Sequence, residues 1–172
     1  NADVNIDSKV KSTLSSKAAI EVIELGASSA TAIYNLKIGD ESYSYINGGN
    51  LFDNHDYGVK AENSNVNIVN NYFKSSNSTG IGVWAFNKPN SGSDYWLKIG
   101  GSTTNEKNSF SNCGIGVLAS EYSHALLQNN TISKTAGIGS YSGSNYQGRF
   151  GIKLVNSGNV IYTCNQNAIS NI

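Results

Sequence analysis

The densest group of side chains that could perform acid–base or metal chemistry is the stretch Asp53-Asn54-His55-Asp56. A histidine between two carboxylates can hold a proton or bind a metal ion. The same stretch also suits an exposed polar corner, and this is the interpretation that we favour. We therefore predict no metal and no cofactor, and we keep Asp53, His55 and Asp56 as the candidates for a catalytic role. The second histidine, His124, has no acidic partner at the matching position of neighbouring repeats, so we interpret it as structural or solvated.

A second possible chemistry is binding through exposed aromatic rings. Trp84 occupies an outward-facing position of a predicted strand, and Tyr95 and Trp96 directly precede another strand. Tyr141 and Tyr146 lie in a large predicted loop. Flat rings at a surface can contact sugars or another protein, and these five are our candidate ligand-binding residues. The alternative, which we favour, is that the rings pack beneath their own loops as small hydrophobic clusters.

The charge and the composition exclude several classes of partner. The 172 residues suit a single domain, and 12 Lys and Arg balance 12 Asp and Glu, so no net field attracts nucleic acid or an anionic membrane. No apolar run approaches the ~18 residues that a membrane-spanning segment needs. Charged residues make up only 14% of the chain, and Asn, Ser and Gly, which disfavour helix interiors, are abundant. This balance is typical of a β-rich extracellular protein with many tight corners.

The candidate residues must be positioned by a repeated unit that closes with Asn-x-Phe or Asn-x-Ile. The copies are Asn50-Leu51-Phe52, Asn71-Tyr72-Phe73, Asn108-Ser109-Phe110, Asn130-Thr131-Ile132 and Asn167-Ala168-Ile169. Successive copies are 21, 37, 22 and 37 residues apart, so short and long steps alternate. A weaker match, Ser12-Thr13-Leu14, keeps this alternation. A series of this kind predicts a stack of equivalent structural units.

Two further columns of the repeat predict strands. A run with glycine at its second position occurs at 57–61, 81–85, 115–119 and 150–154, and 18–22 resembles it. Its apolar first, third and fifth positions should face the core, and its fourth position should face outward. A shorter apolar pair precedes the asparagine signature at Val66/Ile68, Ala125/Leu127 and Tyr162/Cys164. The two longer steps share another element, Leu36-Lys37-Ile38-Gly39 and Leu97-Lys98-Ile99-Gly100.

Strands this short cannot bury a face alone, but a stack of them can. We therefore predict an all-β parallel β-helix of about six rungs, with residues 1–172 as one domain. Identical amides at the strand spacing can bond to one another, so we predict a ladder; the alternative is a set of ordinary turn asparagines. The ladder residues are Asn50, Asn71, Asn108, Asn130 and Asn167. Cys113 and Cys164 fall in different columns about two rungs apart, too far for a disulfide.

The segments LKIGG (97–101) and NSFSNCGIGVLASEYSHALLQNNTI (108–132) resemble the right-handed parallel β-helix repeats of the pectate-lyase-like superfamily. More narrowly, they are similar to repeats in large secreted and surface proteins of Bacteroidota, often exported by the type IX pathway. The resemblance covers about residues 18–172. It implies a right-handed β-helix and a secreted or cell-surface location. It implies no single activity, because lyases, hydrolases, phage tailspikes and adhesins share such repeats.

We expect a structural or adhesive segment of a longer secreted or cell-surface protein. Its partners would be a glycan or surface protein and the neighbouring domains of the same polypeptide, because neither end shows an obvious cap. One alternative is a fragment of a polysaccharide lyase or glycoside hydrolase, which predicts a groove with two carboxylates within ~10 Å, drawn from Asp53, Asp56 and Glu62. The other alternative is a phage-type receptor-binding spike. The adhesive hypothesis predicts an accessible ring at Trp84 or Trp96.

Overall fold

The computed structural model describes residues 3–6, 18–22, 34–40, 50–53, 55–74, 80–87, 95–133, 150–155 and 161–170. Every strand pairing among them is parallel, and the strands form three sheets. Sheet A contains β1 (Asp3–Ile6), β3 (Tyr34–Ile38), β6 (Ser64–Ile68), β9 (Trp96–Gly100), β12 (His124–Gln128) and β15 (Ile161–Asn165). Sheet B contains β2 (Ala18–Val22), β5 (Tyr57–Glu62), β8 (Ile81–Phe86), β11 (Ile115–Ser120) and β14 (Phe150–Val155). Sheet C contains β4 (Asn50–Asp53), β7 (Asn71–Lys74), β10 (Ser109–Ser111), β13 (Thr131–Ser133) and β16 (Ala168–Ser170).

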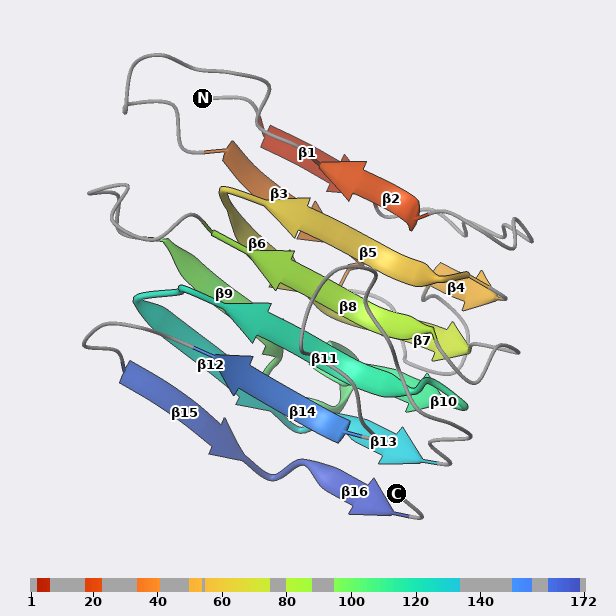
Figure 1. Ribbon diagram of the computed structural model, residues 1–172. Coiled ribbons are helices and arrows are strands. Elements are labelled where there is room, and N and C mark those ends of the chain that lie inside the picture. The colour runs from red at the N-terminus through yellow and green to blue at the C-terminus, as the bar shows by residue number, and fades with distance from the viewer. Residues whose placement is uncertain are drawn as a thin grey trace.

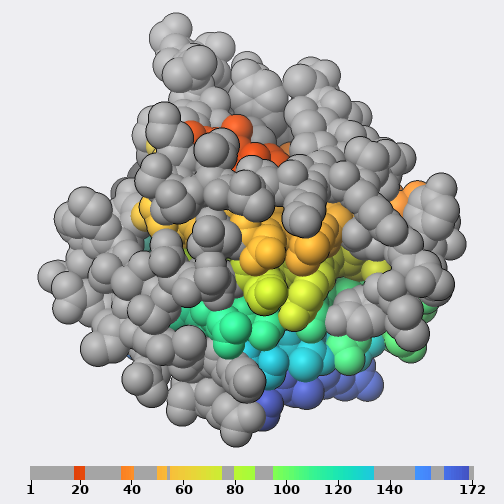
Figure 2. All heavy atoms as spheres, turned by 90° about the vertical axis from the view of Figure 1, so that its right-hand side faces the viewer, coloured from red at the N-terminus to blue at the C-terminus, as the bar shows by residue number. Residues whose placement is uncertain are grey.

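One turn of the chain visits sheet B, then sheet A, then sheet C, and the next turn stacks below it (Figure 1). The space-filling view from the side of sheet C shows these turns as successive coloured bands (Figure 2). The prediction of a parallel β-helix is therefore confirmed. The stack has five complete rungs, β2–β3–β4 to β14–β15–β16, and β1 adds a further strand to sheet A alone. The expected sixth rung is thus represented by one strand among the described residues.

The core consists of the inward columns of all three sheets. In sheet C the rings of Phe52, Phe73 and Phe110 stack with centroids 4.7 and 4.8 Å apart and planes within 8° of parallel. These separations match the spacing of hydrogen-bonded strands, so each ring is held at its height by its own strand. Ile132 and Ile169 continue the column in the next two rungs. The signature Asn-x-Phe/Ile therefore places one large apolar side chain per rung at the same point of the core.

The corner between sheets A and C uses a left-handed backbone conformation in each rung. The positive-φ residues are Gly39, Asn70, Gly100, Asn129 and Gln166. Asn and Gly tolerate this conformation best, which explains their abundance at these corners. In three rungs the ladder asparagine follows at once, but Gly39 and Gly100 precede longer insertions. The second insertion carries the 3-10 helix η1 (Thr104–Glu106).

The structure corrects two details of the predicted columns. Leu97 and Ile99 pair with Val66 and Ile68, so the element of the longer steps is the same sheet A column with an insertion after it. The first position of the glycine-containing run does not join the core. Ile81 and Ile115 form a separate cluster with the outward residues Trp84 and Leu118, and Tyr57 and Phe150 pack against it. The inward place belongs to the glycine, because the ring column of sheet C leaves room for no side chain there.

Candidate functional site

The five asparagines of the predicted ladder are joined by consecutive amide hydrogen bonds along the axis. Each Nδ2 donates to the next Oδ1, at 2.8, 3.2, 3.0 and 2.9 Å in order from Asn50 to Asn167. The lower four amides also donate to sheet A carbonyls, those of Ile38, Ile68, Ile99 and Leu127. These bonds tie sheet C to sheet A inside a buried corner. The ladder is therefore an element of architecture and not a surface for a ligand.

The candidate aromatic residues differ in accessibility. Trp84 is only 7% exposed, and its ring lies against Tyr57 and Phe86, with the Lys60 amine 5.1 Å from the ring centroid. Tyr95 is also buried, at 5%. Trp96 at the start of β9 is 37% exposed, so of the two tryptophans only Trp96 lies at the surface. Tyr141 and Tyr146 lie outside the described residues.

Trp96 does not stand alone on the outer face of sheet A. It pairs in register with His124 of β12, which pairs in register with Ile161 of β15. All three side chains are exposed, and Ile161 reaches 65%. We name these three residues the sheet A stripe. Each of them directly precedes an inward residue of the repeat, so the repeat alignment contains this column. Of the three residues, only Trp96 was predicted to bind a ligand.

A second outward column lies beside the sheet A stripe. Lys98, Leu126 and Thr163 occupy it in the same three rungs. Lys98 forms an ion pair with Glu106 of η1, and the hydrogen bond from this lysine lowers the pKa of the Glu106 carboxyl. The Glu106 carboxylate also accepts a hydrogen bond from the Thr103 amide at 3.0 Å, which closes a capping box. The insertion at this corner is thereby fixed to the sheet beside Trp96.

The catalytic candidates are arranged differently from the prediction. His55 is 3% exposed, so the corner after β4 is not simply an exposed polar loop. Asp53 ends β4 opposite Lys74 and is half-buried, as is Asp56. The Asp56 carbonyl accepts a hydrogen bond from the Ile81 amide at 2.8 Å, so this corner is held to the next rung. Across the described ranges, no group of three His, Cys, Asp or Glu side chains could hold a metal ion.

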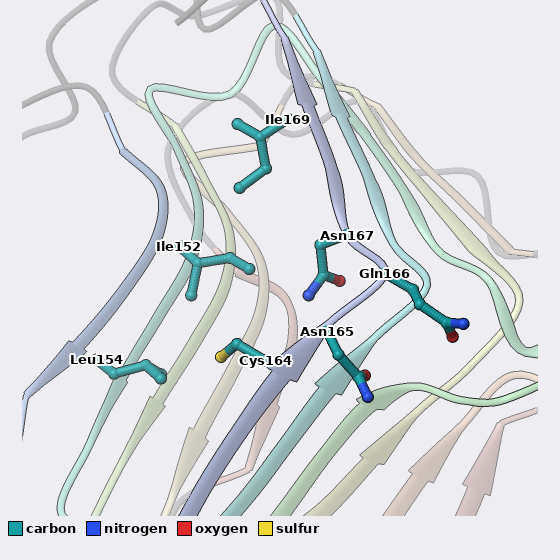
Figure 3. Close-up of a pocket in the computed structure, with 7 residues that line it drawn as sticks. All are labelled: Ile152, Leu154, Cys164, Asn165, Gln166, Asn167 and Ile169. Carbon is teal, nitrogen blue, oxygen red and sulfur yellow. The ribbon is translucent and has the colours of Figure 1, made fainter.

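A hollow of about 490 Å³ opens at the C-terminal end of the stack. Figure 3 shows Ile152, Leu154, Cys164 and Ile169 around this space, with Gln166 turned away from it. None of the acidic candidates lines it, so the carboxylate pair expected in a glycosidase groove is missing from this hollow. Cys164 is exposed here and Cys113 is buried, and the two do not form a disulfide.

Comparisons of this chain with protein family models, with curated proteins and with solved structures give no match. The described part of the chain contains no helix long and apolar enough to cross a membrane.

Proposed function

We propose that this chain is a structural or adhesive segment of a secreted or cell-surface protein, and that it contacts a glycan or a partner protein through the sheet A stripe. The observation that carries the proposal is the exposed Trp96 ring, held in register with His124 and Ile161. Three exposed side chains of adjacent rungs form a row along the axis of the stack. A row of this kind suits an extended ligand.

The chemistry of the row favours a ligand with one apolar and one polar face. An indole ring stacks on the apolar face of a sugar or on an aliphatic side chain. His124 can donate and accept hydrogen bonds beside the ring. The rungs are ~4.8 Å apart, so Trp96 and Ile161 are separated by ~10 Å along the axis, roughly the length of a disaccharide. A sugar polymer lying along the stack would contact all three residues.

The second part of the proposed role is that of a stiff spacer. All described strands hydrogen-bond along the axis, and the asparagine ladder and the phenylalanine stack follow the same direction. Bending such a stack would open hydrogen bonds and aromatic contacts together. The arrangement supports a segment that holds neighbouring parts of a surface protein at a fixed separation.

Binding to an array of immobilised polysaccharides and glycans tests the contact face. Trp96→Ala should weaken binding to the glycan that the original chain binds most tightly by about tenfold or more, because aromatic anchors carry a large share of the binding energy. Tyr72→Ala is the matched control, since Tyr72 is 38% exposed on sheet C and Trp96 is 37% exposed on sheet A. Equal binding by both variants would remove the sheet A stripe from the proposal.

Two outcomes with the same polysaccharides and glycans separate the alternative functions. Release of new reducing ends or unsaturated sugars from any polysaccharide would identify a carbohydrate-active enzyme and overturn the non-enzymatic role. Binding restricted to one bacterial lipopolysaccharide, with no other glycan bound, would favour a receptor-binding spike.

A further inference from the structure

The N–H group of Trp96 is bonded to a side chain, whereas the matching N–H of the next rung is bonded to the main chain. The His124 N–H donates to the Tyr95 carbonyl at 3.4 Å, and the last rung repeats this bond one level further. In both rungs the acceptor is the residue that directly precedes the in-register partner of the donor. The Trp96 N–H donates to Oδ1 of Asn65 at 3.0 Å. Asn65 therefore supplies from its side chain an acceptor that the next two rungs take from the main chain.

The main-chain carbonyl at the corresponding point of the rung above is that of Ser64. The register of β6 and β9 places Asn65 opposite Trp96, so Ser64 is the counterpart of Tyr95. The Ser64 carbonyl accepts a hydrogen bond from the Tyr122 hydroxyl at 3.2 Å. Tyr122 is buried and comes just before β12, so its side chain reaches past the rung of β9 to the rung of β6. The tyrosine thus engages this carbonyl, and the asparagine side chain binds the Trp96 N–H beside it.

Three successive rungs are joined at this corner. β8 and β9 are linked by residues 87–95, whereas β5 and β6 are linked by residue 63 alone. The first residue of the longer link, Asn87, is buried. Its N–H donates to the Ser120 carbonyl at 3.2 Å, and its Nδ2 donates to the Glu121 carbonyl at 3.4 Å. These bonds hold the start of the longer link against the segment that carries Tyr122.

The peptide group between Tyr95 and Trp96 is bonded on both sides. Its N–H donates to Asn65 in the rung above. Its carbonyl accepts from the N–H groups of Ser123 and His124 in the rung below, at 3.1 and 3.4 Å. A peptide plane that is fixed on two sides fixes the direction in which the Trp96 side chain leaves the backbone. Two members of the sheet A stripe, Trp96 and His124, are therefore placed by one peptide group.

We propose that Asn65 is a positioning residue for Trp96, and that it sets the direction of the indole ring before a ligand arrives. The proposal rests on the proposed function of the sheet A stripe, because Asn65 is only 6% exposed and acts through Trp96. An anchor that is already oriented loses less conformational entropy when it binds, and this raises the affinity. Glycan binding therefore depends on a buried side chain that the glycan does not touch.

The fluorescence of Trp96 tests the positioning role without any glycan. The chain has two tryptophans, so Trp84→Phe leaves Trp96 as the only indole. In this parent chain, Asn65→Ala should increase the amplitude of fast indole motion, measured by time-resolved anisotropy, about twofold. Asn65→Asp keeps an acceptor oxygen and should restore the parent value. Asn67→Ala is the matched control, because Asn67 lies on the outer face of the same strand, opposite Lys98.

Binding to the array of immobilised glycans supplies the second readout. Asn65→Ala should weaken binding about fivefold, which is the scale of ordering one large side chain, and Asn65→Asp should recover most of this loss. In the Trp96→Ala chain, Asn65→Ala should have no further effect, since the residue through which Asn65 acts is gone. A further loss there would assign Asn65 a role separate from Trp96 and overturn the proposal. An indole that moves equally in the Asn65→Ala chain and in its parent would also overturn it.

The two readouts fail separately. If Trp96→Ala leaves glycan binding unchanged, the proposed function fails, and the anisotropy measurement still decides whether Asn65 orients Trp96. If Asn65→Ala does not fold, hydrogen exchange in the Trp84→Phe parent takes its place. The Trp96 amide should exchange at least ~100-fold more slowly than an unprotected amide, and exchange at the unprotected rate would overturn the proposal.

Discussion

A Cβ atom placed on Gly82 would lie 2.5 Å from Cδ1 of the Phe110 ring and 2.7 Å from the Gly116 carbonyl oxygen. The glycine and the ring therefore share one site of the core. The same relationship holds one rung earlier between Gly58 and Phe73. The glycine at the second position of the sheet B strand is required by the large side chain across the core, and not by a turn.

Gly82→Ala should lower the free energy of unfolding by about 3 kcal/mol, because the added methyl group must displace either a ring or a strand backbone. Urea unfolding followed by circular dichroism measures the change. The double variant Gly82→Ala/Phe110→Ile should show favourable coupling of about 1 kcal/mol, since the smaller side chain releases part of the clash. Strict additivity of the two single changes would contradict the shared site.

Removing one central amide should show how much the ladder contributes. Asn108→Ala removes the partner of four groups in a buried corner. These groups are the backbone N–H and the side-chain Nδ2 of Asn71, the Ile68 carbonyl and the Asn130 Oδ1. We expect a loss of about 3 kcal/mol. Asn167→Ala, at the half-buried end of the ladder, should cost only about 1 kcal/mol. Similar losses at both positions would mean that burial does not set the strength of the ladder.

Glu121 occupies a corner that favours glycine. Its φ is 60°, a left-handed conformation that is costly for a residue other than Gly or Asn. Glu121→Gly should therefore stabilise the protein by roughly 0.5–1 kcal/mol, measured as an upward shift of Tm. Glu121→Ala serves as the control, because alanine retains the backbone cost. A gain of the same size in both variants would assign the effect to the lost carboxylate.

The Lys98–Glu106 pair predicts a stability change in acid. The hydrogen bond from Lys98 lowers the pKa of Glu106 in the folded state below its value in the unfolded chain. Its stabilising contribution is therefore complete above the unfolded-state pKa and is lost as the pH falls through the folded-state pKa. Thermal unfolding between pH 7 and pH 3 should show a smaller acid-induced decrease of Tm for Glu106→Gln than for the original chain. Parallel curves would contradict this assignment.

The repeat made the interior predictable. A core residue of one rung pairs with an equivalent residue in the rungs above and below, and in some columns the residue type is the same, as at Val59, Val83 and Val117. The asparagine spacing similarly located the corner of every described rung. The first position of the sheet B run was misassigned, because the rule of alternation ignored the space that the phenylalanine rings occupy. The element at Leu97 and Ile99 was also separated from the sheet A column to which it belongs.

The outer surface was less predictable for a physical reason. Trp84 and Trp96 both occupy outward positions of their strands. Trp84 is nevertheless only 7% exposed, whereas Trp96 is 37% exposed. The surroundings of an outward side chain depend on neighbours that vary between rungs, such as Tyr57 and Phe86 beside Trp84. The burial of His55 follows the same principle. Sequence periodicity fixes the direction of a side chain but not what lies over it.

The first and last strands, β1 and β16, lie at opposite ends of the stack (Figure 1), and this has a mechanical consequence. Tension applied between them would act along the direction of the strand-to-strand hydrogen bonds, so the end rungs would open first. Each rung holds about 20 to 40 residues, and its release would lengthen the tether by roughly 70–130 Å. A protein built this way would lengthen in discrete steps under tension, dissipating force while the remaining rungs stay folded.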